Sequence, residues 1–86
     1  MWLVELGFTS DPARLEARPA HRATLVGLNE RGIVRMAGPL SDESGAVIVF
    51  DVPERADVDA LIASDPYYST TGVTVVSIRQ WNPFIS

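Results

Sequence analysis

The sequence lacks cysteine and contains a single histidine, His21, among its 86 residues. Without thiols the chain can form neither disulfides nor thiolate zinc sites, and one imidazole is too few for a histidine-rich metal site. We therefore expect no bound metal and no other cofactor. A chain of this size buries only roughly 60 to 65% of the surface that its unfolded form exposes. Because neither disulfides nor metals reinforce the fold, self-association is the remaining source of added stability.

Lysine and long apolar runs are also missing. Seven arginines against eleven acidic residues give a formal net charge of −4, and the arginines form no cluster, which argues against binding of nucleic-acid phosphates. The longest uninterrupted apolar run, residues 46–50, is far shorter than the ~20 residues of a membrane-spanning helix. The first eight residues include Glu5 and no basic leader, unlike a signal peptide. We expect a cytoplasmic protein without nucleic-acid or membrane partners.

What the sequence does contain is the composition of one folded domain. Hydrophobic residues make up 47% of the chain and charged residues 21%. Such a chain is too apolar to be disordered and too short for two cores. We therefore expect a single domain that covers residues 1–86.

The pattern of apolar residues predicts four strands. Residues 2–8 alternate with a period of two, and three later segments are short, apolar and bounded by turn residues. The predicted strands are Trp2–Phe8, Ile33–Ala37, Ala46–Val52 and Val73–Trp81. Gly38 and Pro39 close the second strand, and the polar turn after them joins it to the third strand in a hairpin.

Two helices are predicted between the strands. Proline inside a helix removes a hydrogen bond and clashes with the preceding turn, so we expect a short turn at Pro12–Glu16 and the main first helix over Pro19–Gly32. The second helix opens at Pro53 and ends before Pro66. The predicted apolar stripes are Ala20, Leu25 and Leu28, flanked by Val26, in the first helix and Val58, Leu61 and Ile62 in the second.

The resulting order, βαββαβ, predicts an α+β fold of the ferredoxin-like kind, in which both helices pack on one face of an antiparallel sheet. The third and fourth strands are apolar on both faces: Ile48 and Phe50 against Val47 and Val49, and Val76 and Ile78 against Val75 and Trp81. The helices can cover only one of these faces. We therefore expect a second copy of the chain on the other face, in a homodimer of the α+β barrel type.

Chain direction brings several chemically useful side chains to one end of this fold. The end of the first strand, the start of the first helix, the hairpin turn and the segment after the second helix all lie at that end. The candidates gathered there are His21, Arg18, Asp65, Tyr67 and Tyr68.

His21 and Asp65 both break an apolar stripe at this end. His21 lies one helical turn before Leu25, and Asp65 lies four residues after Leu61, so both side chains are expected to point inward. A carboxylate can fix the tautomer of an imidazole and leave the other ring nitrogen to accept or deliver a proton. The structural alternative is that His21 bonds a backbone group and that Asp65, which precedes Pro66, only ends the helix.

The other candidates each have two interpretations. Arg18 either binds an anionic group of a ligand or pairs with Asp65 or Glu16. Tyr67 and Tyr68 either line a ligand pocket or are ordinary rim residues. Gly38 and Pro39 are turn formers that would also border a pocket at this end, and no phosphate-binding glycine pattern is present.

The motifs together resemble the YCII-related domain family. The similarity rests on the sequence RPAH at residues 18–21, the spacing of Leu25 and Leu28, Gly32, the sequence AGP at residues 37–39 and the sequence DPY at residues 65–67. It covers nearly the whole chain. The resemblance implies a ferredoxin-like fold, a dimer, and an active-site pair that falls on His21 and Asp65. It leaves the reaction open.

Related dimeric α+β barrels include muconolactone-isomerase-like and dehydrochlorinase-like enzymes that act on small cyclic compounds. From this resemblance and the residues, our leading hypothesis is a cofactor-independent enzyme of the lyase or isomerase type. His21 would move a proton on a small cyclic or anionic substrate, Asp65 would orient His21, and Arg18 would hold a carboxylate or enolate oxygen. The alternative is a dimeric module that binds a small ligand, or serves as an accessory protein, without turnover.

Overall fold

Four strands and two helices follow one another in the predicted order. The computed structural model describes residues 1–86. Its elements are β1 (Trp2–Phe8), α1 (Ala13–Glu30), β2 (Val34–Pro39), β3 (Gly45–Phe50), α2 (Arg55–Ser64), the 3₁₀ helix η1 (Pro66–Ser69) and β4 (Val73–Gln80). The predicted strands agree with the observed ones to within two residues at each end, and β2 and β3 form the predicted antiparallel hairpin.

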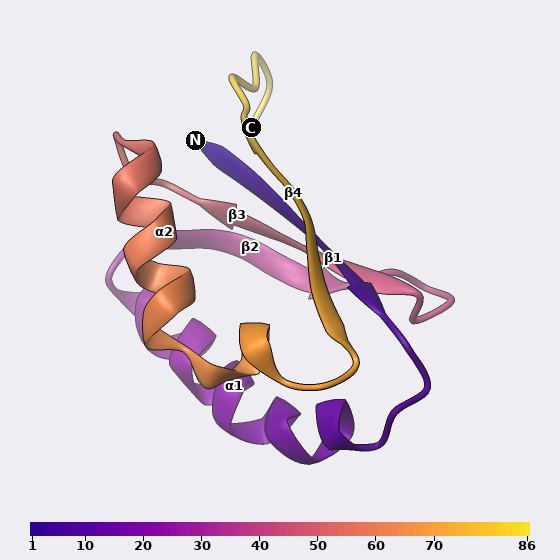
Figure 1. Cartoon of the computed structure of the whole chain (residues 1–86). Coiled ribbons are helices and arrows are strands. Elements are labelled where there is room, and N and C mark those ends of the chain that lie inside the picture. Colours follow the sequence, from indigo (N-terminus) through magenta and orange to yellow (C-terminus); the bar gives the residue numbers. More distant parts are fainter.

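The strands form one antiparallel sheet in the order β2-β3-β1-β4. Both helices lie on the same side of this sheet (Figure 1). The buried core lies between the helices and the sheet and comprises Val4, Leu6, Val34, Ile48, Phe50, Val58, Tyr67 and Tyr68. This arrangement confirms the prediction of a ferredoxin-like α+β fold.

The first helix differs from its prediction because α1 starts at Ala13 and runs through Pro19 without a break. Pro19 and Leu15 are both exposed, so water can reach the Leu15 carbonyl that loses its N–H partner. The inward face is shifted as well: Ala20 and Val26 are exposed. The residues that α1 turns toward the sheet are Arg14, Ala17, His21, Leu25 and Leu28.

The second helix agrees with its prediction. Glu54 and Asp57 form a capping box, in which each side chain accepts a hydrogen bond from the other residue's backbone N–H. Val58 is fully buried, and Leu61 and Ile62 pack against the core. Neither α1 nor α2 is long and apolar enough to cross a membrane.

A bulge in β4 changes which residues face the helices. Glu5 pairs with Ser77 and Leu6 with Val75, so Val76 has no partner on β1. As a result Val75 and Ile78 both pack against the core, while Val76 is 61% exposed. The prediction that Val76 shares a face with Ile78 was therefore wrong, because an inserted residue reverses the alternation of side chains.

The sheet face opposite the helices remains apolar in part. Val49 lies on this face and is buried, although it belongs to no core cluster. Its register partner on β2, Met36, is 63% exposed. An ion pair between Glu5 and Arg79 joins β1 to β4. No helix covers this face (Figure 1).

Candidate functional site

The segments predicted to meet at one end of the fold do so. The Phe8 N–H at the end of β1 donates to the Ser44 carbonyl of the hairpin turn at 2.9 Å. The Thr9 N–H donates to the Gly72 carbonyl, just before β4, at 3.0 Å. These bonds hold the end of β1 between the hairpin turn and the segment that contains η1.

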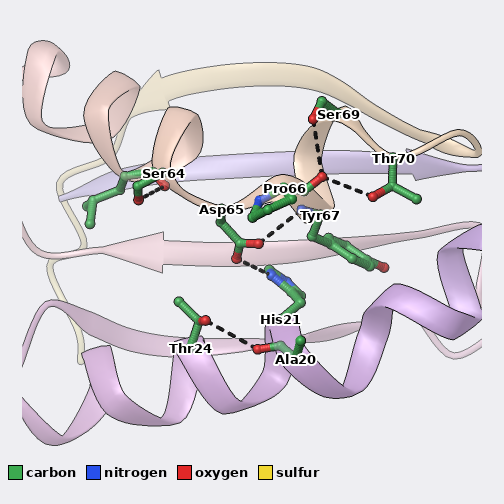
Figure 2. Close-up of polar contacts among 10 residues, drawn as sticks. Ala20, His21, Thr24, Ser64, Asp65, Pro66, Tyr67, Ser69 and Thr70 are labelled. Carbon is green, nitrogen blue, oxygen red and sulfur yellow. Dashed lines mark hydrogen bonds and ion pairs between the residues drawn. The ribbon is translucent and has the colours of Figure 1, made fainter.

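His21 and Asp65 are in direct contact at this end. The Nδ1 atom of His21 lies 2.7 Å from Oδ2 of Asp65, and both side chains are only 7% exposed. Figure 2 shows His21 projecting from α1 toward Asp65, which lies between α2 and η1. A carboxylate oxygen only accepts hydrogen bonds, so the hydrogen of the imidazole is on Nδ1 and the Nδ1–H group donates a hydrogen bond to Asp65.

The other ring nitrogen of His21 is directed to a different environment. No hydrogen bond in the structure uses Nε2, and this atom is not among the fully buried polar atoms that lack a partner. In a neutral imidazole whose hydrogen is on Nδ1, Nε2 carries the unshared electron pair, and His21 lines the pocket described below. An imidazole in this state can accept a proton.

The Asp65-Pro66-Tyr67 sequence explains why Asp65 is held rigidly. Pro66 occupies the first position of η1, where its missing N–H costs nothing, and Asp65 is the residue that caps it. The Oδ1 atom of Asp65 accepts the Tyr67 N–H at 3.0 Å. Each carboxylate oxygen thus has its own donor, and the cap fixes the oxygen that faces His21.

Two tyrosine rings enclose the imidazole. The Tyr67 ring stacks on His21 with centroids 3.9 Å apart and planes 7° from parallel. The Tyr68 ring meets His21 edge-on at 5.3 Å and 87°. Burial, helped by the nearby charge of Asp65 and by Tyr67, raises the pKa of Tyr68 above its ordinary value. Tyr68 is therefore a neutral phenol at any physiological pH.

A pocket of about 570 Å³ opens beside the imidazole. It lies between α1 and the β2-β3 hairpin, and ten of its 17 lining residues are hydrophobic. Of the residues predicted for the site, those that line it are His21, Arg18, Tyr67, Gly38 and Pro39. Asp65 and Tyr68 are buried but do not line the pocket. Both contact His21, Asp65 through a hydrogen bond and Tyr68 through its ring.

The comparison with known families agrees with the motifs and with this geometry. The sequence model of the YCII-related domain matches residues 3–82. The chain belongs to the YCII-related family. None of the curated proteins compared with it shows significant similarity. No three histidine, aspartate or glutamate side chains of this YCII-related domain lie close enough together to hold a metal ion.

Arg18 has a partner that neither interpretation of the sequence anticipated. In this YCII-related domain its Nη1 lies 3.3 Å from Oε1 of Glu43, in the turn of the β2-β3 hairpin. Neither Asp65 nor Glu16 pairs with it. Glu43 has a positive φ of 58°, a conformation set by the turn that a sequence pattern does not reveal. The ion pair bridges α1 and the hairpin beside the pocket.

One residue of the YCII-related domain's pocket was not predicted from the sequence at all. Arg14 lines the pocket, is only 8% exposed, and holds its guanidinium carbon 4.3 Å from the centre of the Phe8 ring. The available signal was its position seven residues before His21, two helical turns away on the same face. Because the predicted helix began at Pro19, Arg14 fell in the predicted turn at residues 12–16, and the direction of its side chain could not be predicted.

Proposed function

We propose that this YCII-related domain is a small cofactor-independent enzyme of the lyase or isomerase type. His21 moves a proton on a small cyclic or anionic organic substrate held in the pocket. The observation that carries the proposal is the 2.7 Å contact between His21 Nδ1 and Asp65 Oδ2, which leaves Nε2 available to the cavity.

The proton transfer follows from the tautomer. Nε2 of His21 takes a proton from a C–H bond next to a carbonyl, and the electron pair of that bond forms the C=C bond of an enolate. Asp65 stabilises the imidazolium that results, because its Oδ2 already accepts the Nδ1–H. In a β,γ-unsaturated substrate this enolate is conjugated with the second C=C bond, so the imidazolium can return the proton at the γ carbon; the double bond then lies between the α and β carbons, which is an isomerisation. In the lyase variant the enolate instead expels a leaving group from the neighbouring carbon, and its electron pair departs with that group.

The remaining site residues have supporting roles in this proposal. Tyr67 keeps the imidazole plane fixed by stacking, and Tyr68 closes the edge of the ring away from the pocket. Gly38 and Pro39 form the opposite wall of the cavity. Arg18 is paired with Glu43 through Nη1 and lines the cavity, so its remaining N–H groups hold a carboxylate or enolate oxygen of the substrate.

Deuterium exchange tests the proposal even while the substrate is unidentified. A panel of small cyclic carbonyl compounds is incubated with the protein in deuterated water, and exchange of acidic C–H positions is followed by NMR. We expect exchange on at least one compound, with a loss of tenfold or more in His21→Gln. Thr24→Ala is the matched control, since Thr24 lies one turn along α1 and its exposed hydroxyl bonds only the Ala20 carbonyl (Figure 2). Exchange that His21→Gln leaves unchanged would exclude His21 as the base.

A second candidate function is a module that binds a small ligand without turnover. The observation in its favour is the largely hydrophobic lining of the cavity, which is typical of binding sites in general. The same panel separates the two functions. Ligands that raise the melting temperature but show no exchange, in parent and His21→Gln alike, would indicate the binding module.

We further propose that a second copy of the chain covers the open sheet face. Val49 and the exposed side chains of Met36 and Val76 support this arrangement, because an uncovered apolar sheet face is typical of an interface. The small core supports it too, since a chain of this length has little stability in reserve.

A further inference from the structure

Arg14 combines burial, positive charge and a complete lack of acidic or hydrogen-bonding partners. It takes part in none of the five ion pairs of the structure. Its Nε is fully buried and has no hydrogen-bond partner. The arginines that donate side-chain hydrogen bonds are Arg18, Arg35, Arg55 and Arg79, so the Nη atoms of Arg14 have no partner either. These two atoms are not among the fully buried atoms that lack a partner, so a ligand can reach them. A buried charge without a partner is costly, so its retention requires an explanation.

The contact with Phe8 explains only part of this arrangement. A guanidinium over an aromatic face gains about 0.5–1 kcal/mol where exposed and about 2 kcal/mol when desolvated. The guanidinium carbon lies over the Phe8 ring, and Nε is fully buried. Stacking leaves the in-plane N–H donors free, and these are the groups that bind a carboxylate through two parallel hydrogen bonds.

The charges around the pocket point in the same direction. The chain as a whole has a net charge of −4, yet the pocket lining includes three arginines, Arg14, Arg18 and Arg22, and no aspartate or glutamate. Of these three, Arg18 is neutralised by Glu43. Arg22 is exposed to solvent, which leaves Arg14 as the buried, uncompensated charge in the cavity.

We propose that Arg14 is the binding residue for a carboxylate group of the substrate, so that the pocket takes a small monocarboxylate with an apolar, ring-sized body. A single guanidinium and a largely hydrophobic wall suit one negative charge attached to an apolar group. A phosphate dianion would need more donors than one arginine offers in such a lining. This inference rests on the proposed function for the role of His21, but the binding of the carboxylate can be tested separately.

The position of Arg14 also constrains the substrate. Arg14 and His21 are seven residues apart on α1, about 10 Å of helical rise, and they share one face. The carboxylate therefore binds at a distance from the imidazole, and the body of the substrate lies between the two. We infer that the carboxylate is not attached to the carbon that loses the proton, and that acetate is too short to use both groups.

Calorimetric titration with benzoate, acetate, benzamide and inorganic phosphate tests this proposal. We expect the parent to bind benzoate more tightly than the other three. Arg14→Gln should weaken benzoate at least tenfold, or about 1.4 kcal/mol, while leaving benzamide unchanged. Arg14→Lys keeps the positive charge but loses the planar pair of N–H donors, so its affinity for benzoate should lie between those of the parent and Arg14→Gln. Arg22→Gln is the matched control from the same pocket, with an expected loss below threefold.

A second readout covers the case in which Arg14→Gln fails to fold. Benzoate should shift one arginine Nε–H signal in the NMR spectrum of the parent protein, and that signal should be missing in Arg14→Lys. We expect Arg14→Gln to melt close to the parent without ligand, because the loss of the contact with Phe8 is offset by the removal of an unpaired charge. A melting temperature lowered by the substitution, with benzoate affinity unchanged, would show that Arg14 is structural.

The outcomes for this inference and for the proposed function are separable. Benzoate binding that depends on Arg14, without any His21-dependent exchange, keeps the carboxylate site and excludes the catalytic proposal. His21-dependent exchange on a compound that carries a carboxylate, if Arg14→Gln leaves it intact, keeps the catalytic proposal and overturns the carboxylate site. Equal losses in Arg14→Gln and Arg22→Gln, or tighter binding of phosphate than of benzoate, would also overturn it.

Discussion

Replacement of Asp65 by asparagine should reverse the tautomer of His21 while leaving the fold in place. The asparagine oxygen can keep the place of Oδ1 and accept the Tyr67 N–H, as in the parent. Its amide nitrogen then faces His21 Nδ1 and donates to it. Since Nδ1 must now accept, the proton moves to Nε2, and the nitrogen that faces the pocket loses its free electron pair.

The magnitude follows from the cost of the opposite amide orientation. If the amide oxygen faced His21 instead, the amide nitrogen would oppose the Tyr67 N–H and leave a buried donor unsatisfied, at about 1–3 kcal/mol. A preference of about 1.4 kcal/mol already makes the inactive tautomer, with its proton on Nε2, ten times as abundant as the active one. We therefore expect His21-dependent exchange to fall at least tenfold in Asp65→Asn.

Stability should change much less than activity. A hydrogen bond to a charged group contributes about 1.5–3 kcal/mol and a neutral one about 0.5–1.5 kcal/mol, so Asp65→Asn should lower the free energy of unfolding by about 1 kcal/mol. For a domain of this size that corresponds to a fall of roughly 4–8 °C in melting temperature. Asp65→Ala removes the acceptors of both Tyr67 N–H and His21 Nδ1–H and should cost more. Full exchange activity in Asp65→Asn would refute the reasoning.

Three further predictions concern stability and assembly. Because the pKa of Tyr68 is raised from 10.0, the folded chain keeps the phenol proton at alkaline pH values where the unfolded chain releases it. The contribution of Tyr68 to the free energy of unfolding is therefore complete below about pH 10 and falls above it by up to about 1.4 kcal/mol per pH unit. Denaturant titrations of Tyr68→Phe should lack that fall. Pro19→Ala restores a donor to the Leu15 carbonyl and should raise the free energy of unfolding by about 1–3 kcal/mol; no gain in a urea titration would contradict our account of α1. Val76→Glu places a charge on the open sheet face and should weaken the dimer, so light scattering should give a lower mass for the variant than for the parent. A parent that is a stable monomer of 9.4 kDa would exclude the dimer proposal.

The sequence predicted the fold well because binary patterns and turn residues act locally. Alternation of apolar residues defined β1, and the prolines at positions 53 and 66 bounded α2. The topology then placed the start of α1 and the end of α2 at the same end of the fold. The contact between His21 and Asp65, 44 residues apart in the chain, could therefore be anticipated from the βαββαβ order together with the positions of both residues on apolar stripes.

The features that the sequence did not predict depend on tertiary context. Proline at position 19 is tolerated inside α1 because it lies on the solvent side, which no local pattern reveals. That error hid the direction of Arg14 and with it the buried guanidinium in the pocket. The bulge at Val76 and the ion pair of Arg18 with Glu43 arise from strand register and turn geometry. Each of these two features depends on how two distant segments lie against each other, so the local pattern of a single segment does not predict it.

The position of the hydrogen on the His21 imidazole decides whether Nε2 can act as the base. The chain has one histidine, so a two-bond proton–nitrogen NMR spectrum of uniformly ¹⁵N-labelled protein contains a single imidazole and needs no assignment. At mildly alkaline pH we expect a protonated Nδ1 and an unprotonated Nε2 in the parent, and the reverse in Asp65→Asn. A parent imidazole with its proton on Nε2, or a spectrum that Asp65→Asn leaves unchanged, would contradict this role of Nε2.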